Sequence, residues 1–276
     1  MPPSMTGTTT GNKIPPVHRQ ASALAIQGRV LLAIMLRETT TRFGRTRFGY
    51  AWALVEPIAH VATLLTIFTL LRRAAPIGND LSLFFTTGIV PWLMFVNISS
   101  RTMKAVDANG ALLSYPQVLP IDIMVGRALL ESGTMIAVFT ILLMGLGALG
   151  SATVPGDFLD LAGALACVTV FATGLGLLNG VAVSLLPSYE KLYTAVTRPL
   201  YFVSGIFFTA DAIPSPMREW MVLNPVLHMI EWTRSGYFQD YDGTHLDRGY
   251  AVAIAAVLLF LGLAAERVAR DRLRRA

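Results

Sequence analysis

The stretch "RETTTRFGRTRFGYAWALVEP" (residues 37–57) sets a group of arginines directly against an apolar segment. We call Arg42, Arg45 and Arg47 the basic collar. The chain then stays apolar for long enough to cross a bilayer, yet it carries the carboxylate of Glu56 within that run. Cations beside a membrane span favour the cytoplasmic side. The stretch therefore predicts a spanning helix that begins at a basic collar and buries an acid.

The composition of the whole chain is that of a polytopic membrane protein. Of its 276 residues, 54% are hydrophobic and only 14% are charged, against roughly a quarter in ordinary soluble domains. The mean hydropathy is +0.56 and the net charge is +5. With this hydropathy, a basic excess favours anionic lipid over nucleic acid as a partner. The single cysteine, Cys167, excludes an intrachain disulfide and a cysteine-based metal cluster.

The first part of the chain precedes the spans. Residues 1–20 are rich in Thr, Pro and Gly, and we expect a disordered cytoplasmic tail. Residues 21–48 contain "VLLAIML" (residues 30–36) between Arg29 and Arg37. Seven apolar residues are too few to cross a bilayer, which takes about 20. We therefore expect an amphipathic helix lying in the membrane interface, followed by the basic collar.

Residues 49–266 predict an all-α integral membrane domain of six helices, because only helices and closed barrels satisfy their backbone in lipid. The expected spans are 50–71, 81–98, 125–150, 159–186, 194–213 and 249–265. Residues 267–276 read as a basic cytoplasmic tail. With both termini placed in the cytoplasm, most arginines and lysines fall on the inner side, which is the expected bias. The basic residues left on the outer side are Arg72, Arg73, Arg218, Arg234 and Arg248.

The connection between the fifth and sixth spans, residues 213–238, is too apolar for a solvated loop. Its prolines, Pro214, Pro216 and Pro225, exclude a continuous span. We expect a re-entrant hairpin of two short helices that either packs on the bundle or rims an exit. Trp220 and Trp232 are its candidate outer-gate residues.

Trp52, Glu56 and His60 are spaced i, i+4, i+8 and share one face of the first span. A charge near the centre of a span costs about 2.5–3.5 kcal/mol, so Glu56 needs water or a partner. This face either lines a conduit or pairs Glu56 with an arginine of a neighbouring helix. Tyr201 and Phe202 in the fifth span leave a similar choice between lipid or core contact and an aromatic conduit wall.

Two spacing patterns within the expected spans predict contacts that stabilise the helices. Arg127 and Glu131, at i and i+4, predict an ion pair within the third span. Gly176 and Gly180 form a small-xxx-small pattern, which predicts close helix packing.

Enzyme signatures are missing from the sequence. It contains no G-x-x-x-x-G-K-[ST] loop and no H-E-x-x-H, and Ser204 lacks the G-x-S-x-G context. We therefore expect no catalytic residue, no metal and no cofactor on this chain. An intramembrane enzyme and a non-transporting scaffold are the alternatives from other functional classes.

The two inner loops, residues 104–122 and 187–199, are short enough to be simple turns or docking sites for a cytosolic partner. The candidate coupling residues are Ala105, Asp107, Asn109, Ser114, Tyr115, Ser188, Tyr189 and Lys191.

Four stretches together resemble the permease subunit of type-2 ABC exporters, in particular capsular-polysaccharide exporters. They are "RFGRTRFGYAWALVEP" (42–57), "TGIVPWLMF" (87–95), "LLSYPQVLPIDIMVGRALLE" (112–131) and "IPSPMREWMVLNPVLHMIEWTRSGYF" (213–238). The resemblance implies an inner-membrane half-transporter that works as a homodimer with two separate ATP-binding subunits, which carry the ATP and Mg²⁺. It also implies export of lipid-linked acidic polysaccharide to the periplasm, with a co-polymerase-type adaptor and an outer-membrane exporter as further partners.

The resemblance leaves the cargo open, since permeases for O-antigen, teichoic acid or small drugs share this architecture. As a hypothesis, the basic collar gathers anionic lipid and the glycolipid head. Trp52, Glu56 and His60 would then continue the polar route inward, alongside Tyr201 and Phe202.

Overall fold

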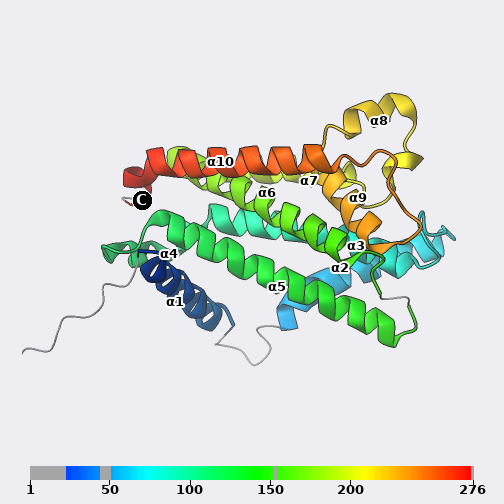
Figure 1. Cartoon of the computed structure of the whole chain (residues 1–276), viewed down its shortest axis with the longest axis horizontal. Coiled ribbons are helices and arrows are strands. Elements are labelled where there is room, and N and C mark those ends of the chain that lie inside the picture. Colours follow the sequence, from blue (N-terminus) through cyan, green and yellow to red (C-terminus); the bar gives the residue numbers. More distant parts are fainter. Residues whose placement is uncertain (1–22, 44–50, 152–153, 275–276) are drawn as a thin grey trace, which may run out of the picture.

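The computed structural model describes residues 23–43, 51–151 and 154–274, and within these ranges every regular element is a helix (Figure 1). The helices are α1 (Ala23–Phe43), α2 (Ala51–Leu70), α3 (Leu81–Met103), α4 (Ala105–Asn109), η1 (Gly110–Ser114), α5 (Pro120–Ala148), α6 (Phe158–Leu185), α7 (Tyr189–Phe202), η2 (Ala210–Ala212), α8 (Ser215–Met221), α9 (Pro225–Tyr237) and α10 (Arg248–Leu273). The expected tail over residues 1–20 lies outside the described residues. Of the expected basic tail, the residues up to Leu273 continue α10.

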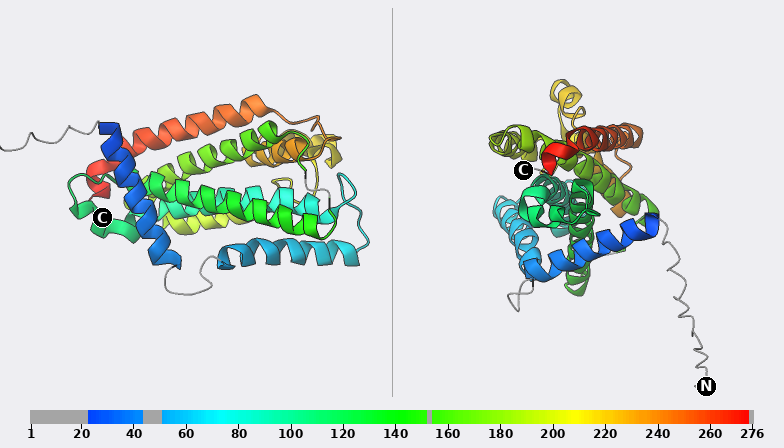
Figure 2. Two further views of the ribbon diagram at one scale, coloured as in Figure 1. Left: turned by 60° about the horizontal axis from the view of Figure 1, so that its bottom comes forward. Right: turned by 90° about the vertical axis from the view of Figure 1, so that its left-hand side faces the viewer.

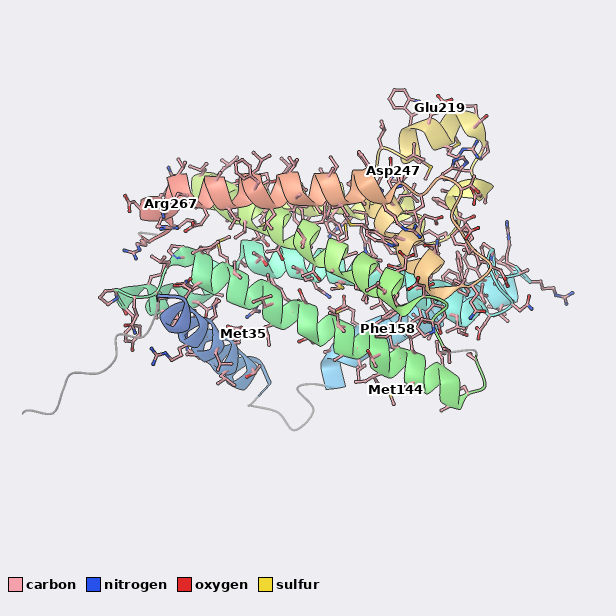
Figure 3. The ribbon with its side chains drawn as sticks, viewed as in Figure 1. Met35, Met144, Phe158, Glu219, Asp247 and Arg267 are labelled. Carbon is pink, nitrogen blue, oxygen red and sulfur yellow. The ribbon has the colours of Figure 1, made fainter. Side chains whose placement is uncertain are left out.

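The long helices run along one another as a bundle (Figure 1). In the described part of the chain, five helices are long and apolar enough to cross a membrane, namely α2, α3, α5, α6 and α10. We call the end that carries α1, α4 and the last turn of α10 the inner end, and the opposite end the outer end. Figure 3 shows Met35 and Arg267 toward the inner end, and Met144, Phe158 and Asp247 toward the outer end.

The expected fifth span, 194–213, is not one helix. α7 ends at Phe202, and the chain continues without regular helix until the single turn of η2 at Ala210. Gly205 adopts a left-handed φ of 80°, a conformation that a helix cannot contain. We call residues 203–209 the irregular segment. The prediction of a continuous helix was wrong because other elements satisfy the freed carbonyls of this segment, and no local pattern indicates those distant partners.

The centre of the bundle is formed by α3 and α6, whose close contacts depend on glycine. A Cβ on Gly174 would lie 2.4 Å from the Leu259 nitrogen of α10, and one on Gly176 would lie 2.6 Å from Thr102 of α3. A Cβ on Gly180 would similarly meet Met124 at 2.5 Å. Backbones can approach this closely only where no side chain intervenes. The packing role predicted for Gly176 and Gly180 is confirmed.

α1 lies across the inner end of the bundle, roughly crosswise to its helices, as an interfacial helix would (Figure 2). Its buried Ile34 packs on Gly126 of α5, where a Cβ would come within 3.3 Å of Ile34. Polar contacts add to this packing, because Gln27 donates to Asp122 and Glu38 pairs with Arg127.

Arg127 and Glu131 interact electrostatically, but the direct ion pair predicted between them is replaced by closer pairs with other helices. Arg127 pairs with Glu38 of α1, and Glu131 pairs with Arg101 of α3, with 3.2 Å between Nε and Oε1. Both charges thus hold neighbouring helices to α5, which the spacing within one helix could not reveal.

Two short helices, α8 and α9, occupy the expected hairpin region, but they differ in their surroundings. α9 packs against α3 and α6 and is largely buried, whereas α8 stands apart from the bundle at the outer end (Figures 1 and 3). α8 carries exposed Met217 and Trp220. The packing alternative therefore holds for α9.

Candidate functional site

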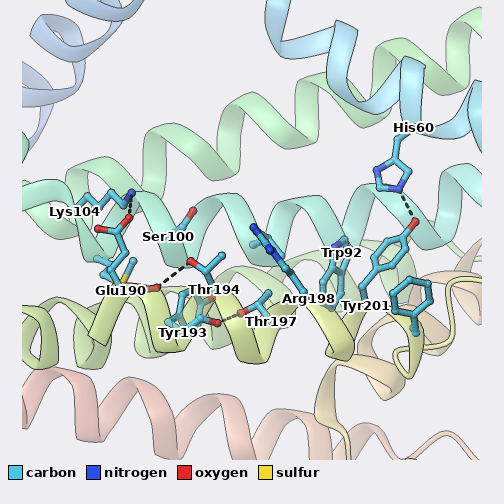
Figure 4. Close-up of a pocket in the computed structure, with 13 residues that line it drawn as sticks. His60, Trp92, Ser100, Lys104, Glu190, Tyr193, Thr194, Thr197, Arg198 and Tyr201 are labelled. Carbon is cyan, nitrogen blue, oxygen red and sulfur yellow. Dashed lines mark hydrogen bonds and ion pairs between the residues drawn. The ribbon is translucent and has the colours of Figure 1, made fainter. Parts of the chain in front are cut away.

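A pocket of about 500 Å³ opens between α2, α3 and α7 (Figure 4). Its walls combine apolar, hydroxyl and charged side chains: His60, Trp92, Val96, Ser100, Met103, Lys104, Glu190, Tyr193, Thr194, Thr197, Arg198, Tyr201 and Phe202. We call it the α7 pocket. It brings together three of the residues singled out in the sequence: His60 from α2, and Tyr201 and Phe202 from α7.

Aromatic side chains gather at the outer end of the α7 pocket. His60 Nε2 and the Tyr201 hydroxyl are hydrogen-bonded at 2.5 Å, which ties α2 to α7. Trp92 of α3 lies edge-on to Tyr201, with ring centroids 5.4 Å apart, and Phe207 of the irregular segment stacks on Phe202 at 5.8 Å. We call Phe68, Trp92, Tyr201, Phe202 and Phe207 the aromatic cluster.

Hydroxyl-bearing residues line the middle of the α7 pocket, namely Ser100, Tyr193, Thr194 and Thr197. The Tyr193 hydroxyl is hydrogen-bonded at 2.6 Å to that of the buried Ser99, and Thr197 donates back to the Tyr193 carbonyl. Arg198 is exposed and projects from α7 toward α3 (Figure 4). Among the described residues it has no hydrogen-bond or ion-pair partner, so its guanidinium is available to an anionic ligand.

An ion pair marks the inner end of the α7 pocket. Lys104 Nζ lies 2.5 Å from Glu190 Oε1, and both side chains are about half exposed. Lys104 ends α3, and Glu190 stands in the first turn of α7. The pair therefore joins the two inner loops that the sequence analysis proposed as docking sites.

The eight candidate coupling residues split into two groups. Ala105 and Asn109 are buried, and Tyr189 is half-buried and donates to Asn179 of α6 at 2.8 Å. The exposed residues, which are free to meet a partner, are Asp107, Ser114, Tyr115, Ser188 and Lys191.

Glu56 is exposed on α2 and has no hydrogen-bond or ion-pair partner among the described residues. Thr63 and Thr66 are also exposed, but their hydroxyls donate to the backbone carbonyls of Ala59 and Ala62. Large apolar side chains are exposed on α2 (Val55, Ile58, Ile67 and Leu70) and on α10 (Val252, Val257, Phe260, Leu261, Leu263 and Val268). The exposed charges of Glu56 on α2 and Arg198 on α7 make the side that carries these two helices poorly suited to lipid.

Some predicted site residues fall elsewhere. Arg45 and Arg47 lie outside the described residues, as do the side chains of Arg42 and Trp52. Trp220 is 77% exposed on α8. Trp232 packs over Gly163 and donates to Asp160 at 2.7 Å, and Asp160 also accepts from Arg248.

Sequence reasoning missed Trp92, Arg198 and the Lys104–Glu190 pair. Arg198 stands three residues before Tyr201, which places both on one helical face and was a usable signal. The ion pair joins residues far apart in the chain and had no local signature. The site holds no nucleophile–base arrangement within the described residues. Its aromatic walls, hydroxyls and free cation suit binding of an amphiphile with an anionic, hydroxyl-rich head.

Comparison with known proteins adds independent information. Residues 29–238 match the family described as "ABC-2 type transporter". The chain is 32% identical over 250 residues to the polysialic acid transport protein KpsM of Escherichia coli, covering 91% of this chain and 97% of that protein. It is 32% identical over 244 residues to the capsule polysaccharide export inner-membrane protein CtrC of Neisseria meningitidis serogroup B, covering 88% and 91%. It is 31% identical over 243 residues to the corresponding protein BexB of Haemophilus influenzae, covering 87% and 91%. The resemblance inferred from the sequence is confirmed.

Proposed function

This chain belongs to the ABC-2 type transporter family, and from that premise we propose that it is the membrane subunit of an ATP-driven exporter of lipid-linked acidic capsular polysaccharide. Two relatives are named for capsule polysaccharide export and one for polysialic acid transport, and each aligns over most of its length. The observation that carries the proposal is the α7 pocket, in a chain with this ancestry. Its aromatic and cationic walls suit sugar rings and an anionic head group.

The conduit forms between two copies of the chain at the side carrying α2 and α7. Glu56 and Arg198 cannot face hydrocarbon cheaply, whereas a partner copy or a hydrated path would accept them. A homodimer that buries this side would complete the open wall of the α7 pocket. Two-fold symmetry is the commonest arrangement for such pairs.

Energy comes from two ATP-binding partner subunits, which carry the ATP and Mg²⁺. They dock at the inner end, on the exposed residues Asp107, Ser114, Tyr115, Ser188 and Lys191. The Lys104–Glu190 pair connects both docking loops directly to the α7 pocket. Movement of the ATP-binding subunits can therefore be transmitted to the α7 pocket through the Lys104–Glu190 contact.

The inner end faces the cytoplasm of a bacterial inner membrane, and the outer end faces the periplasm. The basic collar directly precedes α2 in the sequence, and it attracts anionic lipid and the glycolipid head. A periplasmic adaptor and an outer-membrane exporter receive the glycan. Trp220 on α8 is exposed toward them.

Filling the α7 pocket tests the proposal. Ser100→Trp places an indole in the pocket, and we expect loss of surface glycan with cytoplasmic accumulation of polymer in a capsule-forming strain that lacks the chromosomal copy. The matched control is Ala162→Trp, which fills a second, apolar pocket between α5 and α6. Immunoblots of membranes report abundance for both variants.

Export that survives Ser100→Trp at normal abundance would remove the α7 pocket from the conduit. If the wild-type chain itself fails to restore surface glycan, the assigned cargo is wrong.

A further inference from the structure

The irregular segment has a backbone that α7 cannot satisfy. The last carbonyls of a helix, and those of the residues that follow it, have no partner within the helix. Inside a protein or a bilayer, each unpaired carbonyl is costly because no water replaces the missing donor. Ser204, Gly205 and Ile206 are all buried, so their backbone groups need protein donors.

Arg234 of α9 supplies most of these donors. Its guanidinium donates to the carbonyls of Gly205 at 2.6 Å, Phe208 at 3.0 Å and Ile206 at 3.2 Å. The side chain is 0% exposed. Its guanidinium carbon lies 4.0 Å from the centre of the Phe84 ring.

A glycine of α3 makes the space that this guanidinium occupies. A Cβ on Gly88 would lie 2.8 Å from an Arg234 nitrogen. The two helices therefore approach each other here in a way that fits an arginine head group and excludes a side chain on α3.

The Glu231 carboxylate balances the buried cation, and the Tyr241 hydroxyl supports that carboxylate. Glu231 Oε1 accepts from Arg234 at 3.2 Å, and the Tyr241 hydroxyl donates to the other carboxylate oxygen. Burial, together with the nearby Glu231 carboxylate, raises the pKa of Tyr241 above its ordinary value, so the hydroxyl stays protonated and donates. Desolvating such a pair is expensive, and Arg234 Nε has no partner among the described residues. Apolar side chains in place of this buried ion pair would stabilise the fold at a lower desolvation cost. We therefore infer that the ion pair serves to fix the carbonyl positions of the irregular segment.

A second anchor holds the start of the irregular segment. Asn224 donates to the Val203 carbonyl at 3.3 Å and to the Ser204 hydroxyl at 2.9 Å. Asn224 is the N-cap of α9, and Arg234 stands near the end of that helix. Residues at both ends of α9 therefore hydrogen-bond to the irregular segment.

The irregular segment in turn places aromatic side chains. Phe207 stacks on Phe202 and on Phe68 of α2, with ring centroids 5.8 and 6.5 Å apart, and lies edge-on to Tyr201 at 5.3 Å. Tyr201 and Phe202 line the α7 pocket, and Phe207 packs against both of them. We propose that Arg234 is a positioning residue for the outer end of the α7 pocket, since it fixes the irregular segment and, through it, the aromatic cluster. The consequence for transport rests on the proposed function.

Accessibility of the irregular segment tests the fixing role without any transport assay. In a Cys167→Ser background, Thr209→Cys introduces a single thiol at a position that is 5% exposed. The rate of its reaction with a membrane-impermeant maleimide is measured in the complex with the partner ATPase. We expect Arg234→Lys, which keeps the charge but loses the planar fork, to raise that rate about tenfold. Tyr241→Phe should raise it less, because it removes only the hydrogen bond to Glu231.

Arg218→Gln is the matched control, since Arg218 lies on α8 and has no contact with the irregular segment. Export per ATP hydrolysed is measured in the same chains, and it should fall for Arg234→Lys while membrane abundance and ATP hydrolysis persist. Unchanged labelling in folded Arg234→Lys and Tyr241→Phe would overturn the proposal, as would raised labelling with unaltered export per ATP. If Arg234→Lys fails to fold, the labelling rates of Tyr241→Phe and Glu231→Gln test the proposal instead. A wild-type chain that exports no glycan would refute the proposed function, while the labelling result would still decide the role of Arg234.

Discussion

Glu56 limits what α2 can face more than any other described residue of that helix. It is exposed and unpartnered among the described residues, and charge is too costly to leave in hydrocarbon. The sequence left open whether an arginine of a neighbouring helix would pair with it, and within the described part of the protomer none does. The conduit alternative, in which Glu56 meets water or a second copy, agrees with its place on the side of α2 and α7.

The hydrogen bond between His60 and Tyr201 yields a prediction at the same scale. Tyr201→Phe removes the only polar tie described between α2 and α7, and a typical buried hydrogen bond is worth about 1 kcal/mol. We expect export to fall about fivefold at unchanged abundance, in line with that energy. His60→Phe should act similarly, and the double substitution should be no worse than either, since both remove one contact. Surface glycan measured by immunofluorescence tests this, and additive losses would show that the two side chains act separately.

At the scale of elements, most helices could be predicted from apolar length. α2 and α6 lie within one residue of their expected bounds, whereas α3 and α10 continue past their expected ends and α5 begins before its expected start. The break in the expected fifth span could not be predicted, because the carbonyls that follow it accept hydrogen bonds from Arg234, which the sequence analysis counted as an outer-loop cation. Hydropathy reports which residues avoid water but not which carbonyls a distant arginine will satisfy. The direct ion pair expected between Arg127 and Glu131 is absent for a similar reason. Arg127 pairs with Glu38 of α1 and Glu131 pairs with Arg101 of α3, and spacing within one helix cannot reveal such partners.

The two inner loops act as one element if the Lys104–Glu190 pair transmits motion between them. Exposed ion pairs contribute only about 0–1 kcal/mol to stability, so reversing one charge should leave folding unaffected. We expect Lys104→Glu to reduce glycan-dependent stimulation of ATP hydrolysis in the reconstituted complex, because two carboxylates would repel across the contact. Lys104→Glu combined with Glu190→Lys should restore it. A double reversal no better than the single one would show that the contact does not carry coupling.

At the scale of the whole molecule, the exposed polar residues of the bundle favour one side for the proposed contact between two copies. α10 presents apolar side chains such as Phe260, which is 70% exposed, and lipid can cover them without cost. α2 and α7 instead present Glu56, Thr63 and Arg198 beside exposed apolar positions such as Val196. An interface that mixes hydrophobic contact with a hydrated polar path accounts for both kinds of residue on one side.

This arrangement predicts where two copies can be cross-linked. Cys167 is the single cysteine and is buried, so Cys167→Ser supplies a clean background. Thr63→Cys or Val196→Cys should form covalent dimers with a short bis-maleimide in native membranes, because both positions lie on the proposed interface. Phe260→Cys is the control, exposed on α10, and should remain monomeric on denaturing gels. Dimers formed through Phe260→Cys but not through the other two positions would move the interface to α10, and the open wall of the α7 pocket would then face lipid. That outcome is energetically unfavourable for Arg198, which is why the cross-linking pattern tests the placement of the conduit as well as the dimer.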